Sequence, residues 1–271
     1  MQIAISNIGW HPSEEAAVAK TLQELGVRYV EIAPTKVWED PTNVSDDQIK
    51  AYLDFWKSHG ITVVAFQSML FGRNDLTIFD DDATRATTKA HLDKFITLAG
   101  RMGAGVLVFG SPKNRRMPVN MDDDTAEHIA EAFFGALGDT ATANKTTFCI
   151  EPNPEAYECN FITNAAAGRR LVADVANPGF RLHLDAAGMT LAGDDPTNAI
   201  TDAKDYLQHF HISAPYLGLL EETEVPHKKL AAALRDINYQ GYTSIEMRPG
   251  DEGENVERVR KAVAIAQKHY A

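Results

Sequence analysis

The sequence has few of the features that mark secreted, membrane-bound or nucleic-acid-binding proteins. Only two of its 271 residues are cysteines, Cys149 and Cys159, which is too few for a disulfide framework in a chain of this size. Its net charge of −12 is the opposite of the basic surface that binds nucleic acids or anionic membranes. No apolar segment approaches the ~18 residues of a membrane helix, and the start MQIAISNIGW does not resemble a signal peptide. We therefore expect a cytoplasmic protein with a small-molecule partner and with neither a nucleic-acid nor a membrane partner.

Short β-rich segments alternate with longer amphipathic segments along the whole chain. This alternation predicts an α/β fold, with a parallel sheet covered by helices, and eight units predict closure into a (β/α)8 TIM barrel. Because no change in composition marks a domain boundary, residues 1–271 are expected to form a single domain. The eight candidate strands are 2–6, 28–33, 62–67, 105–110, 146–151, 180–185, 207–212 and 242–247.

The segments between the strands carry the start and stop signals of helices. Ser13 and Ser45 each precede an amphipathic segment, and Gly26 and Gly60 stand just past the ends of these segments, as N-caps and C-terminal glycines do. An open doubly wound sheet is the main alternative fold, but it usually has a glycine-rich turn after its first strand, and SNIGWHPSEE has one glycine. Further helices are expected over 83–102, 122–143, 163–175, 194–204, 227–237 and 253–269.

Four consecutive candidate strands in the second half end on a side chain that can bind a metal. TFCIE ends at Glu151, RLHLD at Asp185, LQHFH at His211 and YTSIE at Glu246. In a parallel barrel, the C-terminal ends of all strands open onto one face, where the loops form the active site. Three carboxylates and an imidazole suit a divalent cation. A helix cap or an ion pair would explain any one of these residues, but four at the same end of neighbouring strands favour a shared metal site.

This set of side chains also indicates a class of reaction. A divalent ion can polarise a carbonyl and an adjacent hydroxyl together. Two glutamates on opposite sides of the substrate can then remove a proton next to the carbonyl and return it. Glu151 and Glu246 are therefore the candidate catalytic pair, whereas Asp185 and His211 are expected mainly to anchor the metal.

Two further histidines are predicted to lie below the metal site. Because side chains two positions apart share one face of a strand, His183 and His209 should lie one layer beneath Asp185 and His211. They either orient the metal ligands through their ring nitrogens or are core histidines bonded to the backbone or to water. The residues alone leave both interpretations open.

Loops after the other strands are expected to contact the substrate. GSPKNRRMP brings Lys113, Arg115 and Arg116 together in an acidic protein, and these groups suit a substrate hydroxyl, carboxylate or phosphate, although a solvated loop explains Arg116 equally well. Aromatic side chains in such loops often form the apolar wall of a sugar pocket. The candidate substrate-binding residues are Lys113, Arg115, Trp10, Gln67, Asn153 and Tyr216.

The chain resembles the xylose isomerase-like barrels of the sugar phosphate isomerase and epimerase group. The resemblance runs nearly end to end and is strongest in CIEPNPEAYECNFITN, LHLDAAGM, HFHIS and GYTSIEM. Within this group the chain is similar to ketose 3-epimerases of the tagatose/psicose type, which bind manganese or a similar ion and exchange the C3 proton through a cis-enediolate. The resemblance implies Mn²⁺ as the cofactor, with Mg²⁺, Co²⁺ or Zn²⁺ as alternatives. Barrels of this group often dimerise, so both a monomer and a homo-oligomer are compatible with the sequence. The resemblance places the metal ligands at Glu151, Asp185, His211 and Glu246 and the proton-transferring groups at the two glutamates.

Two departures from those epimerases bear on the substrate. Gly188 stands where they have a histidine, three residues after the metal aspartate. Tyr216 and Leu217 stand in the segment where they have an arginine, shortly after the metal histidine. In those enzymes both side chains hold substrate oxygens near the metal. The resemblance therefore carries over the metal site but not the specificity for a free ketose.

We accordingly predict a metal-dependent isomerase or epimerase of carbohydrate metabolism that acts on a ketose or keto-sugar derivative through proton transfer next to a carbonyl and an enediolate. The main alternative is a lyase or dehydratase, which would use the same metal and base to expel a leaving group. A non-catalytic sugar-binding barrel is less favoured because binding alone does not need both Glu151 and Glu246. An apurinic-site endonuclease is also less favoured, because such enzymes of this superfamily use several more histidines and a basic DNA-binding face.

Overall fold

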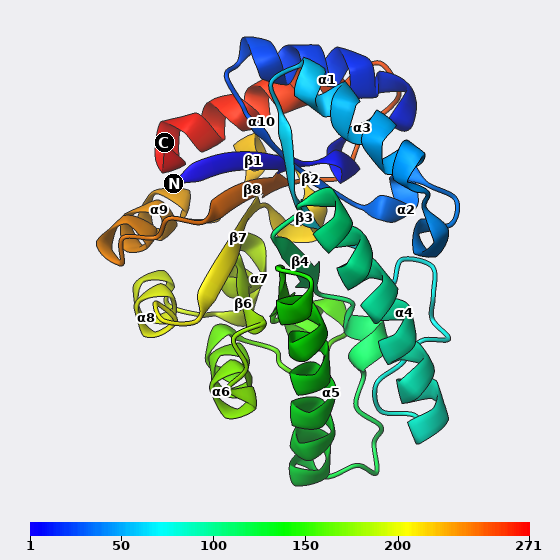
Figure 1. The fold of residues 1–271 in the computed structure, drawn as a ribbon. Coiled ribbons are helices and arrows are strands. Elements are labelled where there is room, and N and C mark those ends of the chain that lie inside the picture. The colour runs from blue at the N-terminus through cyan, green and yellow to red at the C-terminus, as the bar shows by residue number, and fades with distance from the viewer.

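Eight parallel strands form a closed barrel in which each strand pairs with the next and β8 pairs with β1 (Figure 1). The structure, a computed structural model, describes the backbone of residues 1–271 and all side chains except that of Glu222. The predicted TIM barrel is confirmed, and each predicted strand is present to within one residue at either end. The strands are β1 (Gln2–Ser6), β2 (Tyr29–Ile32), β3 (Thr62–Phe66), β4 (Val106–Phe109), β5 (Thr147–Ile150), β6 (Phe180–Asp185), β7 (Leu207–Ser213) and β8 (Tyr242–Glu246).

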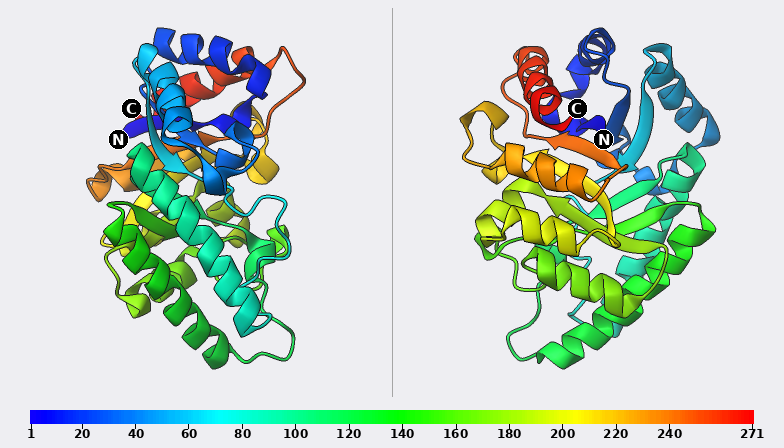
Figure 2. Two further views of the ribbon diagram at one scale, coloured as in Figure 1. Left: turned by 45° about the vertical axis from the view of Figure 1, so that its right-hand side comes forward. Right: turned by 90° about the vertical axis from the view of Figure 1, so that its left-hand side faces the viewer.

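Helices surround the barrel, and α10 packs against α1 and α9, which brings the two termini close together (Figures 1 and 2). None of the helices in the described part of the chain is long and apolar enough to cross a membrane. The α-helices are α1 (Glu15–Glu24), α2 (Pro34–Val37), α3 (Asp46–Ser58), α4 (Asp82–Met102), α5 (Asp123–Ala143), α6 (Ala165–Val175), α7 (Ala186–Ala192), α8 (Pro196–Asp202), α9 (His227–Asp236) and α10 (Asn255–Tyr270). Short 3-10 turns are η1 (Asn7–Gly9), η2 (Pro12–Glu14), η3 (Pro41–Asn43), η4 (Pro112–Arg115), η5 (Glu155–Tyr157), η6 (Pro215–Leu217) and η7 (Leu220–Glu222).

One of the two predicted N-caps is confirmed and the other is wrong. Ser45 caps α3 in a reciprocal capping box with Gln48. Ser13 instead lies inside the 3-10 turn that Pro12 begins, and α1 starts after Glu14 without a side-chain cap. The Glu14 carboxylate accepts hydrogen bonds from the His11 backbone and from the Asn255 side chain, which holds this turn against the start of α10.

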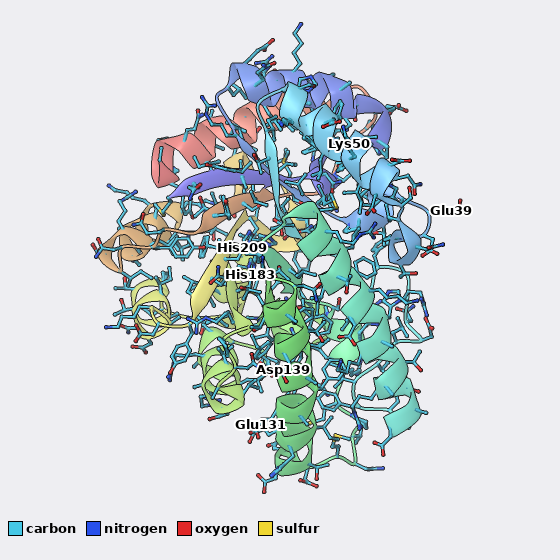
Figure 3. The ribbon with its side chains drawn as sticks, in the orientation of Figure 1. Glu39, Lys50, Glu131, Asp139, His183 and His209 are labelled. Atoms are coloured by element: carbon cyan, nitrogen blue, oxygen red, sulfur yellow. The ribbon has the colours of Figure 1, made fainter. Side chains whose placement is uncertain are left out.

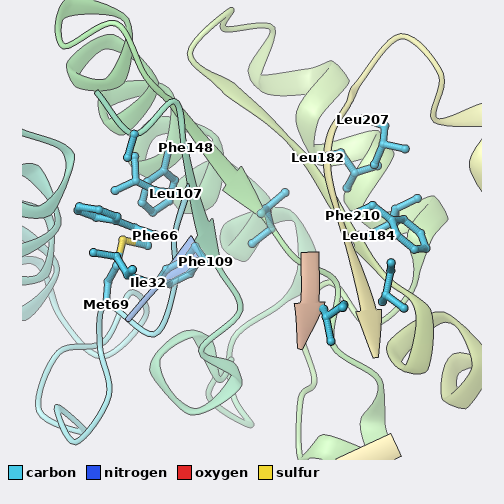
Figure 4. Packing of buried hydrophobic residues seen from close by; sticks show 14 of the residues in the cluster. Ile32, Phe66, Met69, Leu107, Phe109, Phe148, Leu182, Leu184, Leu207 and Phe210 are labelled. Atoms are coloured by element: carbon cyan, nitrogen blue, oxygen red, sulfur yellow. The ribbon is translucent and has the colours of Figure 1, made fainter. Parts of the chain in front are cut away.

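The core has two parts, one on each side of the sheet. Large side chains on the outer face of the strands, such as Phe66, Phe148 and Phe210, pack under the helices (Figure 4). Inside the barrel, a smaller apolar cluster is formed by Ala4, Val64, Ala65, Val106, Val108 and Cys149. The rest of the interior is polar, although the interior of such barrels is normally filled by branched apolar residues. Its buried polar side chains include Glu31, His183, His209, His211 and Ser244, none of these more than 1% exposed.

Candidate metal centre and substrate pocket

The four predicted metal ligands line one pocket at the C-terminal mouth of the barrel. The pocket has a volume of about 690 Å³ and is enclosed mainly by the loops that follow β3, β4, β5 and β7. Glu151, Asp185, His211 and Glu246 all belong to its lining. The strand ends therefore bring to one place residues that are far apart in the sequence.

Three of the four residues place ligand atoms within the reach of a single ion. Glu151, Asp185 and His211 each offer an atom within 4.8 Å of the atoms offered by the other two. The fourth residue lies beside them, with Glu246 Oε2 3.4 Å from His211 Nδ1. Three carboxylates and one imidazole nitrogen thus converge, as expected for a divalent-ion site.

Asp185 is held in place from both sides of its carboxylate. It is the N-cap of α7, where its Oδ1 accepts a 2.6 Å hydrogen bond from the Gly188 backbone N–H. Its Oδ2 accepts a hydrogen bond from the Ser213 hydroxyl, and that hydroxyl in turn accepts one from the Ala187 N–H at 3.0 Å. Such partners fix the orientation of a metal-binding carboxylate. Ser213 follows His211 by two positions on the same face of β7, a spacing that could have revealed it in the sequence.

His211 is oriented by Glu31 on β2, a residue that the sequence analysis missed. Glu31 Oε2 lies 3.0 Å from His211 Nε2, and both side chains are at most 1% exposed. Because a carboxylate only accepts hydrogen bonds, Nε2 is the donor, and Nδ1 is left facing the pocket. Nδ1 has no hydrogen-bond partner among the described residues. The sequence signal was present, since Glu31 is the single charged side chain within β2.

The pair is electrostatically coupled. Burial alone would raise the pKa of the Glu31 carboxyl, but His211 and His209 lower it to about 2. Burial alone would lower the pKa of His211, but Glu31 and Glu246 raise it well above its usual value. A cation bound at Nδ1 would therefore take the place of the proton that the neighbouring carboxylates favour on His211.

The carboxylates at the centre repel one another, and a cation would relieve this repulsion. Burial, together with the charges of Glu246 and Asp185, raises the pKa of Glu151 to about 8. Burial and Glu246 raise the pKa of Asp185 to about 6. The approach of Glu151 depends on Gly110, because a Cβ at that position would lie 2.3 Å from Glu151 Oε2. The donor set, its mutual repulsion and this close approach fit a divalent ion.

His183 and His209 lie beneath the centre, fully buried in the barrel (Figure 3). Their Nδ1 atoms share a hydrogen bond of 3.1 Å, and the ring of His183 packs edge-on against that of His211 with 4.2 Å between centroids. Burial lowers the pKa of both histidines, that of His209 to about 4. Their Nδ1 atoms thus bond each other and not a metal ligand, so they contact His211 through ring packing.

Four of the six expected substrate-binding residues line the pocket, namely Lys113, Gln67, Asn153 and Tyr216. Gln67 and Asn153 are 2% and 5% exposed. Neither end of the Gln67 amide nor the Asn153 Oδ1 has a hydrogen-bond partner within the described part of the chain. Buried polar groups are normally paired, so these atoms are candidates for contact with a bound molecule.

The other two, Trp10 and Arg115, lie away from the pocket walls, which corrects the expectation for both. Trp10 is 1% exposed and packs near Trp56 of α3 in the outer core. Arg115 is fully buried, and its Nη2 donates a 2.7 Å hydrogen bond to the backbone oxygen of Glu151. The sequence showed that these loops contain a charged residue and an aromatic residue, but it did not show in which direction their side chains point. Arg115 therefore binds the backbone of Glu151 and does not line the pocket.

A parallel barrel with a buried histidine and three carboxylates in a pocket at its mouth is the arrangement of an enzyme with a candidate divalent-metal site. Residues 19–269 match the family model of the xylose isomerase-like TIM barrel. The chain belongs to this family, as the sequence resemblance implied.

Similar proteins include several sugar epimerases. A D-psicose 3-epimerase from Agrobacterium fabrum (strain C58 / ATCC 33970) is 26% identical over 227 residues, which cover 82% of this chain and 75% of the relative. The structure of a D-psicose 3-epimerase in the presence of D-fructose superposes with a TM-score of 0.84 at 20% identity, over 100% of this chain and 99% of that one. The apo structure of 3-keto-D-glucoside 4-epimerase from E. coli superposes with a TM-score of 0.82 at 19% identity, over 99% of each chain. The structural likenesses show a shared fold, and the epimerase relatives support assignment of the chain to the isomerase and epimerase class of enzymes.

Proposed function

We propose that this enzyme epimerises a ketose or keto-sugar by moving a proton on the carbon next to a carbonyl. The observation that carries the proposal is the convergence of Glu151, Asp185, His211 and Glu246 at the floor of one pocket. These four residues would hold a divalent ion, for which Mn²⁺ suits the mixed oxygen and nitrogen donors. When bound, such an ion polarises the substrate carbonyl and an adjacent hydroxyl.

Glu151 and Glu246 are the groups that we assign to proton transfer. They come from the ends of β5 and β8, so they approach the pocket from different sides of the barrel mouth. Inversion at carbon requires one group to remove the proton from one face and another to deliver a proton to the opposite face.

The remaining pocket residues would position the sugar. The unpaired amide group of Gln67, the unpaired Oδ1 of Asn153 and the ammonium group of Lys113 are placed to bind hydroxyls. They come from the loops after β3, β5 and β4, which leaves the metal ligands of β6 and β7 free to hold the reacting end. With its hydroxyls bound by the loops and its reacting end bound at the metal centre, the sugar would have one defined carbon between the two glutamates.

The test is solvent exchange with a panel of ketoses and keto-glycosides in heavy water, after the metal content of the protein has been measured. We expect deuterium to enter next to the carbonyl and Glu246→Gln to lower the rate by roughly 100-fold or more. Glu155→Gln is the matched control, because Glu155 is exposed in η5 and does not line the pocket. The proposal fails if the protein binds a divalent metal yet no member of the panel exchanges a proton.

A further inference from the structure

The mouth of the pocket carries exposed aromatic side chains above the candidate metal centre. Phe71 is 78% exposed and Tyr216 is 61% exposed. Among the described residues, Val119 is the one other large apolar side chain that is exposed to this degree. Both Phe71 and Tyr216 line the pocket, whereas Val119 does not. Exposed apolar side chains that gather at one site indicate binding.

The Tyr216 side of this mouth is held in a conformation that costs free energy. Tyr216 and Leu217 both have φ of +57°, a left-handed conformation that is unfavourable for bulky residues. The Tyr216 N–H donates a 3.0 Å hydrogen bond to the Tyr157 hydroxyl, and the Arg248 N–H donates one of 2.9 Å to the Leu217 oxygen. The rings of Tyr157 and Tyr216 meet edge to face with 5.4 Å between centroids. The surrounding structure therefore enforces the placement of the Tyr216 ring.

The pocket contains more space than a single sugar ring fills. Even if each of the roughly 12 heavy atoms of a hexose took the ≈ 30 Å³ of a liquid water molecule, a hexose would fill only about half of the 690 Å³. Bonded atoms take less space than separate waters, so the unfilled part is larger still. The volume that remains extends to the mouth, because Phe71 and Tyr216 line the same pocket as the floor residues.

The two differences from the ketose 3-epimerases, at Gly188 and at Tyr216, also favour a substrate with a second ring. The backbone N–H of Gly188 bonds Asp185, and a Cβ at this position would lie 3.2 Å from Asp185 Oδ1. Gly188 therefore contributes no polar side chain to the substrate. The loop after β7 presents the Tyr216 ring instead of a guanidinium group. An aromatic ring suits the C–H face of a second sugar ring, and the exposed Lys113 and Asn74 in the lining of the same pocket can bind its hydroxyls.

We propose that the substrate is a two-ring keto-glycoside, whose ketone-bearing ring lies at the metal centre and whose second ring packs against Phe71 and Tyr216. A glycosidic bond blocks the anomeric carbon, so the ketone must stand at another carbon of the ring. One proton leaves the carbon next to this ketone and one is returned on the opposite face. The glycosidic bond stays intact, and substrate and product have the same composition, so no oxidant or reductant is needed. This inference rests on the epimerase function proposed above.

The test compares three substrates in heavy water: a free ketohexose, a keto-glucoside with a methyl aglycone, and a keto-glucoside whose aglycone is a second hexose. We expect the two-ring compound to have the highest kcat/KM, by about tenfold or more over the methyl compound. Phe71→Ala and Tyr216→Ala should each raise the KM of the two-ring compound by roughly 3- to 10-fold, with kcat little changed because the lost contact is the same in ground and transition states. Both variants should raise the KM of the methyl compound clearly less than that of the two-ring compound.

Two control variants test whether the effects are specific to the aromatic rings that line the pocket. Val119→Ala removes an equally exposed apolar side chain outside the pocket and should leave all three substrates unchanged. Tyr216→Phe keeps the ring and should retain the wild-type KM. The inference is overturned if the aromatic variants affect the methyl and two-ring compounds equally, or if the free ketohexose is the best substrate. A lack of exchange with all three would instead refute the epimerase function itself.

Discussion

At the scale of single residues, His211 connects the buried interior of the barrel with the pocket. Its Nε2 is bonded to Glu31, and its Nδ1 faces Glu246 and the other candidate ligands. The hydrogen bond to Glu31 fixes which nitrogen is free to bind a cation. The affinity for a metal should therefore depend on Glu31, although this residue does not line the pocket.

Replacement of Glu31 tests this dependence. Glu31→Gln keeps the size of the side chain but removes its charge, so the affinity for Mn²⁺ should fall by about 10- to 100-fold, as for other residues that orient a metal ligand. Isothermal titration calorimetry measures the affinity without any substrate. Glu155→Gln should bind as the wild type does, and an unchanged affinity in Glu31→Gln would show that His211 does not need this partner.

The close approach at Gly110 gives a second test at this scale. An added Cβ would meet the flexible end of Glu151 at 2.3 Å, so the carboxylate rather than the backbone should move. Gly110→Ala should therefore weaken metal binding by roughly tenfold or more with little loss of thermal stability. Gly105→Ala, at the other end of β4, adds a Cβ that meets no atom within 4 Å and should bind metal normally. Equal affinities in the two variants would contradict this assignment.

At the scale of secondary-structure elements, the sequence predicts the strands better than it predicts the helix starts. Each strand is a short apolar segment bounded by polar or turn residues, and the structure forms strands where this local pattern occurs. The start of α1 could not be predicted from Ser13, because Pro12 begins a 3-10 turn and a distant partner, Asn255, holds Glu14. The helix α7 was also unexpected, because it starts immediately after the last residue of β6 with Asp185 as its cap.

The two serines provide a matched test of this difference. Ser45→Ala removes a side-chain cap and half of a capping box and should cost about 1 kcal/mol of stability, or roughly 2–4 °C in Tm for a protein of this size. Ser13→Ala removes no helix cap and should cost clearly less. Differential scanning calorimetry distinguishes them, and equal shifts would mean that Ser13 stabilises the start of α1 after all.

At the scale of the whole molecule, the barrel and the four strand ends were predictable, whereas long-range contacts were not. Parallel strands that alternate with helices place their C-terminal ends together in any such barrel, so the candidate ligands could be grouped from their positions alone. The pairing of Glu31 with His211 joins residues 180 positions apart. The inward turn of Arg115 likewise depends on its contact with the Glu151 backbone. The sequence marks Glu31 as the single charged residue of its strand, but it does not identify the partner of either side chain, because both contacts depend on the three-dimensional arrangement of the strands.

The contact between α9 and α10 makes the free energy of unfolding depend on pH, because it involves the buried side chain of His227. This buried residue at the start of α9 bonds the hydroxyl of Tyr270 at the end of α10, and burial and His269 lower its pKa to about 4. The unfolded chain, with a pKa near 6.5, binds this proton first as the pH falls. The stability from neutral His227 is therefore complete above pH 6.5 and lost between pH 6.5 and about 4, by up to roughly 3 kcal/mol.

The contribution of His227 to the pH dependence of stability is obtained by comparing the wild type with a variant that lacks only this histidine. His227→Gln keeps a polar side chain that can bond Tyr270 but does not titrate. The stability of the wild type relative to this variant, measured by urea unfolding, should fall steadily from pH 7 to pH 4.5. A difference that stays constant over this range would show that His227 does not titrate on unfolding.

The central claim is that two different carboxyl groups exchange a proton with the carbon next to a carbonyl. Its most direct test is the deuterium content of the epimer formed during a single turnover in heavy water. Because the group that returns the proton differs from the group that removed it, the product should carry deuterium at the inverted carbon, and Glu246→Gln should slow its formation by roughly 100-fold or more. An inverted product without deuterium at that carbon would contradict the account.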